Sequence, residues 1–316
     1  MGPWSRWLRR TERLMDARVL ALLRILVCAA IVLDLLRVAQ LGLVDDFYVL
    51  FPDGGINRSP DPSAWIDDRL GPRGGILAYW TTITCLVLAG LGVATRPAML
   101  IGVLAYAQIG HLYDPGDRGV DRLLRTVLVI LLFSGAHRRL ALGLYALPRL
   151  RRDWVPAWPA DLVRWVMVML YLSAGIAKLM VQPGWVGTPK LPVVYRIMTD
   201  PMAAHMDPVA LEPYWLLWTF FGWATIAVEL SSPLLLTRFG RFWSLLAIPM
   251  HLGIALCMDL GMFSYGVISL HVLLLYPWLL PLLDRLPALR NRASPPPGAW
   301  VEHGRGPEAV PATAPT

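Results

Sequence analysis

The sequence predicts an all-α integral membrane protein, a polytopic bundle of about eight transmembrane helices with both termini in the cytoplasm. The chain of 316 residues is 56% hydrophobic and only 16% charged. A soluble core cannot account for so much apolar sequence. The apolar residues form runs long enough to cross a bilayer, and the arginines gather between alternate runs. We therefore expect a multi-pass protein of the cell membrane, with the lipid bilayer as its first partner.

Eight apolar runs approach the length of about 20 residues that a helix needs to cross the hydrocarbon core. They lie near residues 19–41, 76–95, 97–113, 123–142, 161–182, 214–237, 242–260 and 263–284. Arg96-Pro97 separates the second run from the third, because proline disfavours helix at the preceding residue and arginine prefers the interface. The first run is interpreted as a span rather than a cleaved signal peptide, because it is long and carries charged residues.

Arginine placement orients the spans, because cytoplasmic loops carry an excess of positive charge. One set of alternate loops holds Arg6, Arg9, Arg10, Arg13, Arg18, Arg96, Arg138, Arg139, Arg149, Arg151, Arg152, Arg238, Arg241, Arg285, Arg290 and Arg292. The opposite loops at 42–75 and 183–213 are acidic or mixed, and we expect them to cap a cavity from outside. The domain plan is then a basic cytoplasmic N-terminus at 1–18, a transmembrane domain at 19–284, and a disordered cytoplasmic tail at 285–316 that is rich in proline and alanine.

The sequence lacks the motifs that are typical of several classes of function. The net charge of +7 comes from short arginine clusters rather than one basic stripe, so nucleic acid is not an expected partner. Cys28, Cys85 and Cys257 lie far apart inside apolar runs and are interpreted as packing residues. The sequence contains no HExxH motif, no cysteine and histidine cluster and no glycine-rich phosphate loop, so it predicts neither a metal site nor a nucleotide site.

Ionisable residues inside the runs need a partner, a water-filled cavity or a function. Inserting one at the bilayer centre costs about 2.5–3.5 kcal/mol of free energy. These residues are Asp34, Arg37, His111, Arg125, Lys178, Glu229, His251 and His271. Asp34 and Arg37 have the i, i+3 spacing that would let them pair with each other. The segment 117–122 is expected to form a solvated cap at the start of the fourth span, since aspartate at a helix start is favoured by the helix dipole.

Lys178 is the strongest candidate for a functional group. Tyr171, Gly175 and Lys178 are spaced i, i+4 and i+7, so they share one helix face, and Gly175 would let another helix approach. A lysine in an apolar site tends to lose its charge, and a neutral amine can act as a base or nucleophile. The alternative is that Lys178, about one turn from the outer end of its span, extends its ammonium group to the interface.

Glu229 and His251 are the next candidates. Glu229 lies between Trp223 and Pro233, where it would be protonated or paired with an arginine. Such a pair can relay a proton or merely lock two helices. His251 lies in an otherwise apolar run, and its alternative role is that of a hydrogen-bonded packing residue. His111 and His271 give weaker signals.

Three segments, in this order and spacing, carry a resemblance to a known family. They are Ala174-Gly175-Ile176-Ala177-Lys178-Leu179 with Trp185 and Gly187 following, then Glu229-Leu230-Ser231, then His251 leading to Gly261-Met262-Phe263-Ser264-Tyr265. Arg24 and Asp34 in the first span fit as well. Over most of residues 19–280 the chain resembles the transmembrane part of the vitamin K-dependent gamma-carboxylase superfamily, including the HTTM (horizontally transferred transmembrane) proteins.

The resemblance implies a quinone- or lipid-dependent enzyme. In the carboxylase, a lysine at the place of Lys178 is the base toward vitamin K hydroquinone. By resemblance, Lys178 would be the catalytic base, Glu229 would balance or relay charge, and His251 would hydrogen-bond a quinone, hydroquinone or similar lipid in a cavity open to the outer leaflet.

Two departures separate the chain from the carboxylase. Trp154 stands where the carboxylase pattern has a histidine, and a short tail replaces the large domain that helps to hold the protein substrate. We therefore do not expect full glutamate carboxylation.

A non-enzymatic membrane component, transporter-like or partner-binding, is the alternative function. The two halves of the sequence show no convincing repeat, which weighs mildly against transport.

Overall fold

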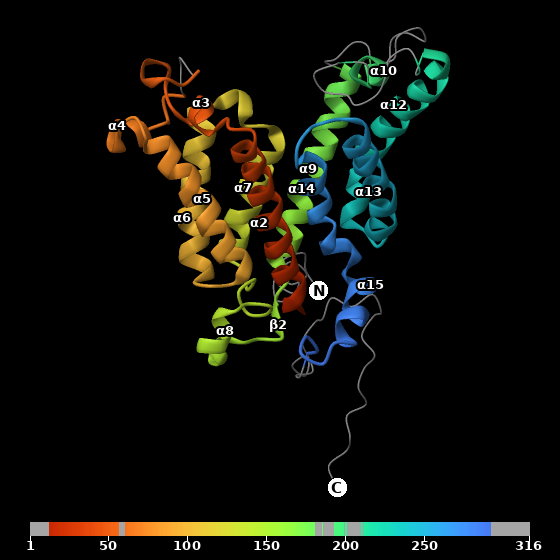
Figure 1. Ribbon diagram of the computed structural model, residues 1–316. Helices are drawn as coiled ribbons and strands as arrows, with labels where there is room; N and C mark the ends of the chain where they lie inside the picture. Colours follow the sequence, from red (N-terminus) through yellow and green to blue (C-terminus); the bar gives the residue numbers. More distant parts are fainter. Residues whose placement is uncertain are drawn as a thin grey trace, which may run out of the picture.

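The computed structural model describes residues 13–56, 61–180, 185, 193–198, 200, 210 and 212–291. The expectations for most of the N-terminus, for most of the outer loop at 183–213 and for most of the tail fall on residues outside these ranges. The described part is an all-α bundle with one very short sheet (Figure 1).

The longer helices follow the apolar runs. They are α2 (Ala17–Gln40), α5 (Gly74–Leu91), α6 (Thr95–Leu112), α7 (Gly119–Leu132), α9 (Trp158–Met180), α12 (Trp215–Leu230), α13 (Gly240–Cys257), α14 (Phe263–Leu270) and α15 (Val272–Asp284). Short helices α3 (Val44–Tyr48), α4 (Ile66–Leu70), α8 (Gly143–Ala146) and α10 (Val193–Met198) lie in the connections. Single 3-10 turns occur at Phe51–Asp53, Asp114–Gly116, Pro148–Leu150, Glu212–Tyr214 and Ser232–Leu236.

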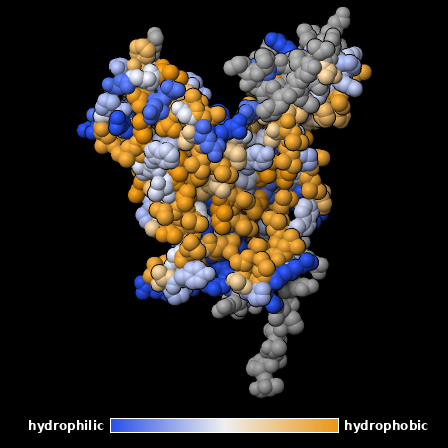
Figure 2. All heavy atoms as spheres, in the orientation of Figure 1, coloured by the Kyte–Doolittle hydropathy of each residue, from blue (hydrophilic) through white to orange (hydrophobic). Residues whose placement is uncertain are grey.

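Only some of these helices are long enough on their own to span a membrane. Among the described residues, α2, α5, α9 and α13 are long and apolar enough to cross a bilayer, and α14 with α15 would make a fifth span with a bend of 68° between them. Figure 2 shows apolar surface across the middle of the molecule and hydrophilic residues toward both ends. This distribution is what a bilayer around the middle of the bundle requires.

The predicted end of the fourth helical run is wrong. Helix α7 stops at Leu132 instead of continuing to 142. The hydroxyl group of Ser134 donates to the carbonyl of Leu131 and accepts from the amide of Ala136, 3.0 Å away, so a local turn replaces the next helical hydrogen bonds. The next helix in the chain is the short α8, which begins at Gly143.

A small antiparallel sheet joins the start of the chain to the segment before α9, which the all-α prediction did not include. Strand β1 (Leu14–Asp16) pairs with β2 (Trp154–Pro156). Arg18 also forms an ion pair with Asp284, 2.7 Å away, and Arg139 donates to the carbonyl of Leu289 over 2.6 Å. Residues 13–18, 134–157 and 284–291 therefore meet at one end of the bundle, which we call the basic end.

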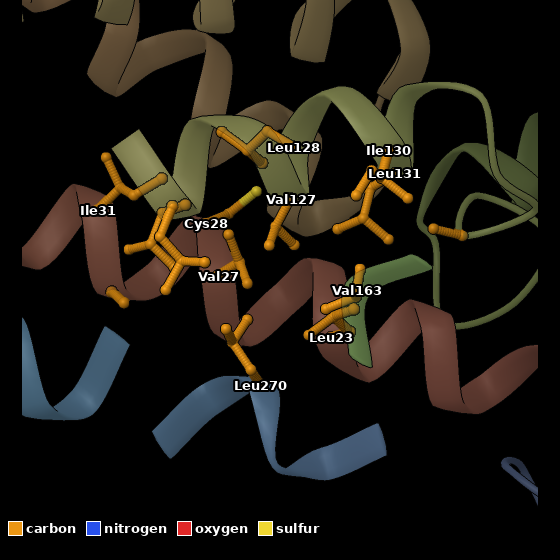
Figure 3. Packing of buried hydrophobic residues seen from close by; sticks show 14 of the residues in the cluster. Leu23, Val27, Cys28, Ile31, Val127, Leu128, Ile130, Leu131, Val163 and Leu270 are labelled. Atoms are coloured by element: carbon orange, nitrogen blue, oxygen red, sulfur yellow. The ribbon is translucent and has the colours of Figure 1, made fainter. Parts of the chain in front are cut away.

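Helix α2 lies at the centre of the core (Figure 3). Its buried Leu23, Val27 and Ile31 belong to one cluster with side chains of α7, α9 and α14. Those labelled in the figure include Val127, Leu131, Val163 and Leu270. Because α2 is apolar on nearly every side, it suits this central position better than a one-sided amphipathic helix would.

The predicted pair of Asp34 with Arg37 is wrong. Asp34 pairs with Arg118 and accepts from the amide of Met262 over 2.9 Å, while Arg37 pairs with Asp259 at 2.6 Å. Each charge thus finds a partner on another segment, which neutralises it and ties α2 to its neighbours.

The predicted cap of the fourth span is confirmed in position but differs in environment. Arg118 is the N-cap of α7, and its amide donates to the carboxylate of Asp121 over 2.9 Å. Asp121 is only 5% exposed and also accepts from the hydroxyl group of Tyr106 over 2.7 Å. The cap is therefore part of the packed bundle rather than a solvated turn.

Arg24 is a fully buried charge that is satisfied by carbonyl groups. It donates to the backbone oxygen of Gly90 in α5 and to those of Ala136 and Leu140 in the segment after α7. Within the described ranges it forms no ion pair with a carboxylate. Its role is to connect α2 with the end of α5 and with the turn after α7.

Replacing Arg24 with methionine should destabilise the protein by about 2 kcal/mol or more, because three carbonyl groups lose a charged donor. Thermal unfolding in detergent micelles measures the effect. Arg37→Met removes an exposed pair and should cost about 1 kcal/mol or less. Equal unfolding temperatures for Arg24→Met and wild type would show that Arg24 does not hold these segments together.

Candidate functional site

Lys178 and Glu229 form a two-pronged ion pair between α9 and α12. The ammonium nitrogen of Lys178 lies 2.6 Å from Oε1 and 2.8 Å from Oε2 of Glu229. The Lys178 side chain is 16% exposed and that of Glu229 is 8% exposed. The partner of Glu229 is thus Lys178 rather than the arginine that was considered, and the ammonium group is held within the bundle.

Gly175 makes this contact possible, as its position on the Lys178 face suggested. A Cβ atom on Gly175 would lie 3.1 Å from the Cβ of Glu229 and 3.0 Å from the nearest side-chain carbon of Leu230. The helix that approaches is therefore α12. The ammonium group of Lys178 also lies 5.0 Å from the centre of the Trp185 ring, within the range of a cation–π interaction.

The geometry of the pair bears on the expected chemistry of Lys178. Two short contacts from one nitrogen to both oxygens of a carboxylate are typical of an ammonium–carboxylate pair. An ammonium group has no free electron pair, so Lys178 can act as a base only after it passes a proton to Glu229. The contact of 2.6 Å is short enough for that transfer.

A second polar cluster lies deeper along α9. The hydroxyl group of Tyr171 lies between the Nε2 atoms of His251 and His271, at 2.9 Å and 3.2 Å. Nδ1 of His271 contacts the hydroxyl oxygen of Ser244 at 2.9 Å, and that hydroxyl group donates to the carbonyl of Gly240 over 3.1 Å. These residues form one buried chain of hydrogen bonds across α9, α13 and the junction of α14 with α15.

The donor and acceptor in each of these hydrogen bonds can be assigned by starting from Ser244. Because the Ser244 proton goes to a carbonyl group, Nδ1 of His271 must be the donor to Ser244, and its Nε2 then accepts from Tyr171. The hydroxyl oxygen of Tyr171 is left to accept from Nε2 of His251. Nδ1 of His251 is therefore an acceptor, and it is buried without a hydrogen-bond partner among the described residues.

The three candidates from the sequence are placed in two groups. Lys178 and Glu229 are in direct contact, while His251 contacts Tyr171. Tyr171 and Lys178 lie seven residues apart on one face of α9, which corresponds to about 10 Å along the helix axis. The two groups are thus neighbouring parts of one helix face rather than a single cluster.

Sequence reasoning missed Ser244 and Trp243, and it ranked His271 below the three main candidates. The Trp243 ring stacks on His271 with 6.0 Å between ring centres and meets the Tyr171 ring edge-on at 4.9 Å. Ser244 and His251 have the i, i+7 spacing of one face of α13, which was the available signal. His271 gave no such signal, because it lies at the break between α14 and α15.

The other ionisable candidates lie elsewhere. Arg125 pairs with Asp117 at 2.6 Å, and His111 lies 3.7 Å from Asp61 at the surface. Arg125 lies within α7 and His111 lies in the last turn of α6, and neither contacts the two polar clusters in the part of the chain that the structure describes. Within the described ranges no group of three histidine, cysteine or acidic side chains could hold a metal ion.

The Gly175 contact predicts a sharp dependence on side-chain size. Gly175→Leu should destabilise the protein by about 1–3 kcal/mol, because the added atoms would overlap Leu230 and Glu229. Gly253→Leu is the matched control, since a side chain on that helical glycine meets open space. Thermal unfolding of both variants in detergent is the measurement, and equal effects would contradict the close approach of α12.

The comparison with known families covers both polar clusters. The HTTM domain family matches residues 12–278, from the residue before the described N-terminus into α15. No curated protein and no solved structure matches the chain. The matched region contains Lys178, Glu229, His251 and nearly the whole helical bundle, so the chain belongs to the HTTM domain family as a multi-pass integral membrane protein.

Proposed function

We propose that the protein is a membrane enzyme that moves a proton through the Lys178–Glu229 pair and acts on a quinol or another weakly acidic lipid. The observation that carries the proposal is the two-pronged contact of these side chains inside an apolar bundle. The resemblance to the carboxylase, in which a lysine at this place is the base, gives the pair a chemical role.

The proposed step conserves every proton. Glu229 accepts a proton from Lys178 across 2.6 Å, which leaves a neutral amine beside a carboxylic acid. A bound quinol would supply a weakly acidic hydroxyl group. Lys178 then takes up the proton of that group and becomes an ammonium ion again, so Glu229 is the net acceptor. The restored positive charge remains at the site, where it balances the negative charge that proton removal creates.

The surrounding residues fit a lipid-soluble ligand that carries a hydroxyl group. Nδ1 of His251 is a buried acceptor that needs a donor, and a ligand hydroxyl group can provide one. Trp185 contributes an aromatic surface beside Lys178. His251 would hold the ligand, while Tyr171, His271 and Ser244 fix the ring orientation of His251 through their hydrogen bonds.

A non-enzymatic role is the second candidate, and the same ion pair favours it. Lys178 and Glu229 directly join α9 to α12, so their pair can serve only to lock these helices in a transporter-like or partner-binding protein. An arginine at position 178 separates the two roles, because it keeps the ion pair but does not release its proton.

Lys178→Arg should preserve the thermal stability of the protein and abolish proton transfer to Glu229. The measurement is infrared difference spectroscopy of the purified protein on addition of menadiol, a small quinol, with the protonated-carboxyl band as the signal. Wild type should show the band, and Glu229→Gln should remove it. A band in Lys178→Arg as strong as that in wild type contradicts the base assignment, and no band in wild type favours the non-enzymatic role.

We also propose eight membrane crossings with both termini in the cytoplasm. The crossings are α2, α5, α6, α7, α9, α12 with the turn at Ser232–Leu236, α13, and α14 with α15. The arginines of the basic end support this orientation, since segment 134–157 carries five of them against one aspartate.

Cysteine labelling in intact cells tests this orientation. In a background without the three native cysteines, an impermeant maleimide should label Asp68→Cys and should not label Tyr145→Cys. Both positions are exposed, and Tyr145 lies at the basic end. Labelling of Tyr145→Cys with protection of Asp68→Cys would mean that the protein is inserted in the opposite sense.

A further inference from the structure

An apolar groove lies at the basic end, far from the Lys178 site. It has a volume of about 670 Å³ and runs between α2, α5 and the segment 139–151. Its walls include Ala29 and Leu33 of α2, Val87 and Leu91 of α5, and Leu142. Leu33, Leu91 and Leu142 are each about half exposed, so the groove opens toward the surroundings of the bundle. We call it the basic-end groove.

One end of the basic-end groove is positively charged. Arg139 and Arg151 line it. Arg139 is paired with Asp153 at 2.9 Å, whereas Arg151 forms no ion pair with any carboxylate in the described part of the chain. Arg24, behind the wall, donates to the carbonyl groups of Gly90 and Leu140, which both line the groove. The groove therefore combines apolar walls with arginines that are not all neutralised by carboxylates.

Neighbouring arginines add to this excess. Burial and the nearby charges of Arg96 and Arg152 lower the pKa of Arg138. Arg151 likewise disfavours the charge of Arg139, whose pKa is lowered chiefly by burial. Positive groups that repel one another are stabilised when an anion lies among them.

The residues at the edge of the basic-end groove are of the types found at a membrane interface. Tyr145 is 87% exposed and Leu147 is 44% exposed, and arginines flank the stretch from Leu140 to Pro148 on both sides. Exposed apolar side chains next to arginine are favoured where acyl chains meet headgroups. In a bilayer around the middle of the bundle, the apolar part of the groove would face acyl chains and Arg151 would lie at the level of the phosphates.

We propose that the basic-end groove binds one acyl chain of an anionic phospholipid, whose phosphate lies against Arg151. The inference goes beyond the proposed proton transfer, because the groove lies at the basic end, where α9 begins, whereas Lys178 lies near the other end of α9. Lys178 is about 20 residues from the start of that helix, or about 30 Å. Lipid binding at the groove and chemistry at Lys178 can therefore succeed or fail independently.

The test uses the full chain in phosphatidylcholine nanodiscs with trace spin-labelled phosphatidylglycerol or phosphatidylcholine. Electron paramagnetic resonance measures the immobilised fraction of each label. Wild type should immobilise phosphatidylglycerol in preference to phosphatidylcholine, and Arg151→Gln should lower that preference by about fivefold, the contribution of one arginine near an anionic surface. Arg149→Gln is the matched control, because Arg149 is exposed on the same segment and does not line the groove.

A variant whose side chain fills the groove gives a second test in the same experiment. Ala29→Trp should lower the immobilised fraction of phosphatidylglycerol, whereas Leu26→Trp, on the same helix and exposed outside the groove, should not. Equal immobilisation of the two lipids by wild type, or equal losses in Arg151→Gln and Arg149→Gln, would overturn the proposal. Unchanged immobilisation in Ala29→Trp would do so as well. Where Ala29→Trp does not fold, the two arginine variants decide the outcome.

Discussion

The structure depends on one constraint, which is that a charge inside an apolar bundle must be satisfied by another part of the protein. Helix α2 shows the result. Its Arg24 binds three carbonyl groups of two other segments, its Asp34 pairs with Arg118 at the start of α7, and Arg18 at its own start pairs with Asp284. Apolar packing alone would let helices slide or rotate past each other in lipid, because lipid tails are as apolar as leucine. The polar contacts of α2 fix which helices surround it and at what depth.

The same constraint explains the resting geometry of the candidate site. The Lys178–Glu229 pair joins α9 to α12, and Gly175 brings the two backbones close enough for the contact. A pair that only holds helices together and a pair that exchanges a proton have the same resting geometry. What favours chemistry is the neighbouring acceptor on His251, which is held by Tyr171 and left without a partner among the described residues. A purely structural histidine would be expected to have both ring nitrogens satisfied.

Hydropathy predicted where most of the longer helices lie, because a helix that crosses a bilayer needs an apolar run of about 20 residues. It did not predict the end of α7, which depends on a local turn at Ser134. It also singled out Lys178, Glu229 and His251, since isolated polar residues in such runs are conspicuous. The partners could not be predicted, because pairing depends on how helices are arranged in space. Asp34 pairs with Arg118, 84 residues away, although Arg37 had the better local spacing. His271 was undervalued for the same reason, since only the approach of α9 and α13 gives it a role.

Mass spectrometry of lipids extracted from the purified protein tests most directly whether the Lys178 site serves a quinol. Wild type should retain a quinone or another isoprenoid phenol, and both Lys178→Met and His251→Leu should retain much less of it, because one loses the ammonium group and the other the buried acceptor. Arg149→Gln, an exposed substitution at the opposite end of the bundle, should retain as much as wild type. Ordinary phospholipid alone in wild type and variants would contradict the enzymatic assignment and leave the ion pair as a structural lock.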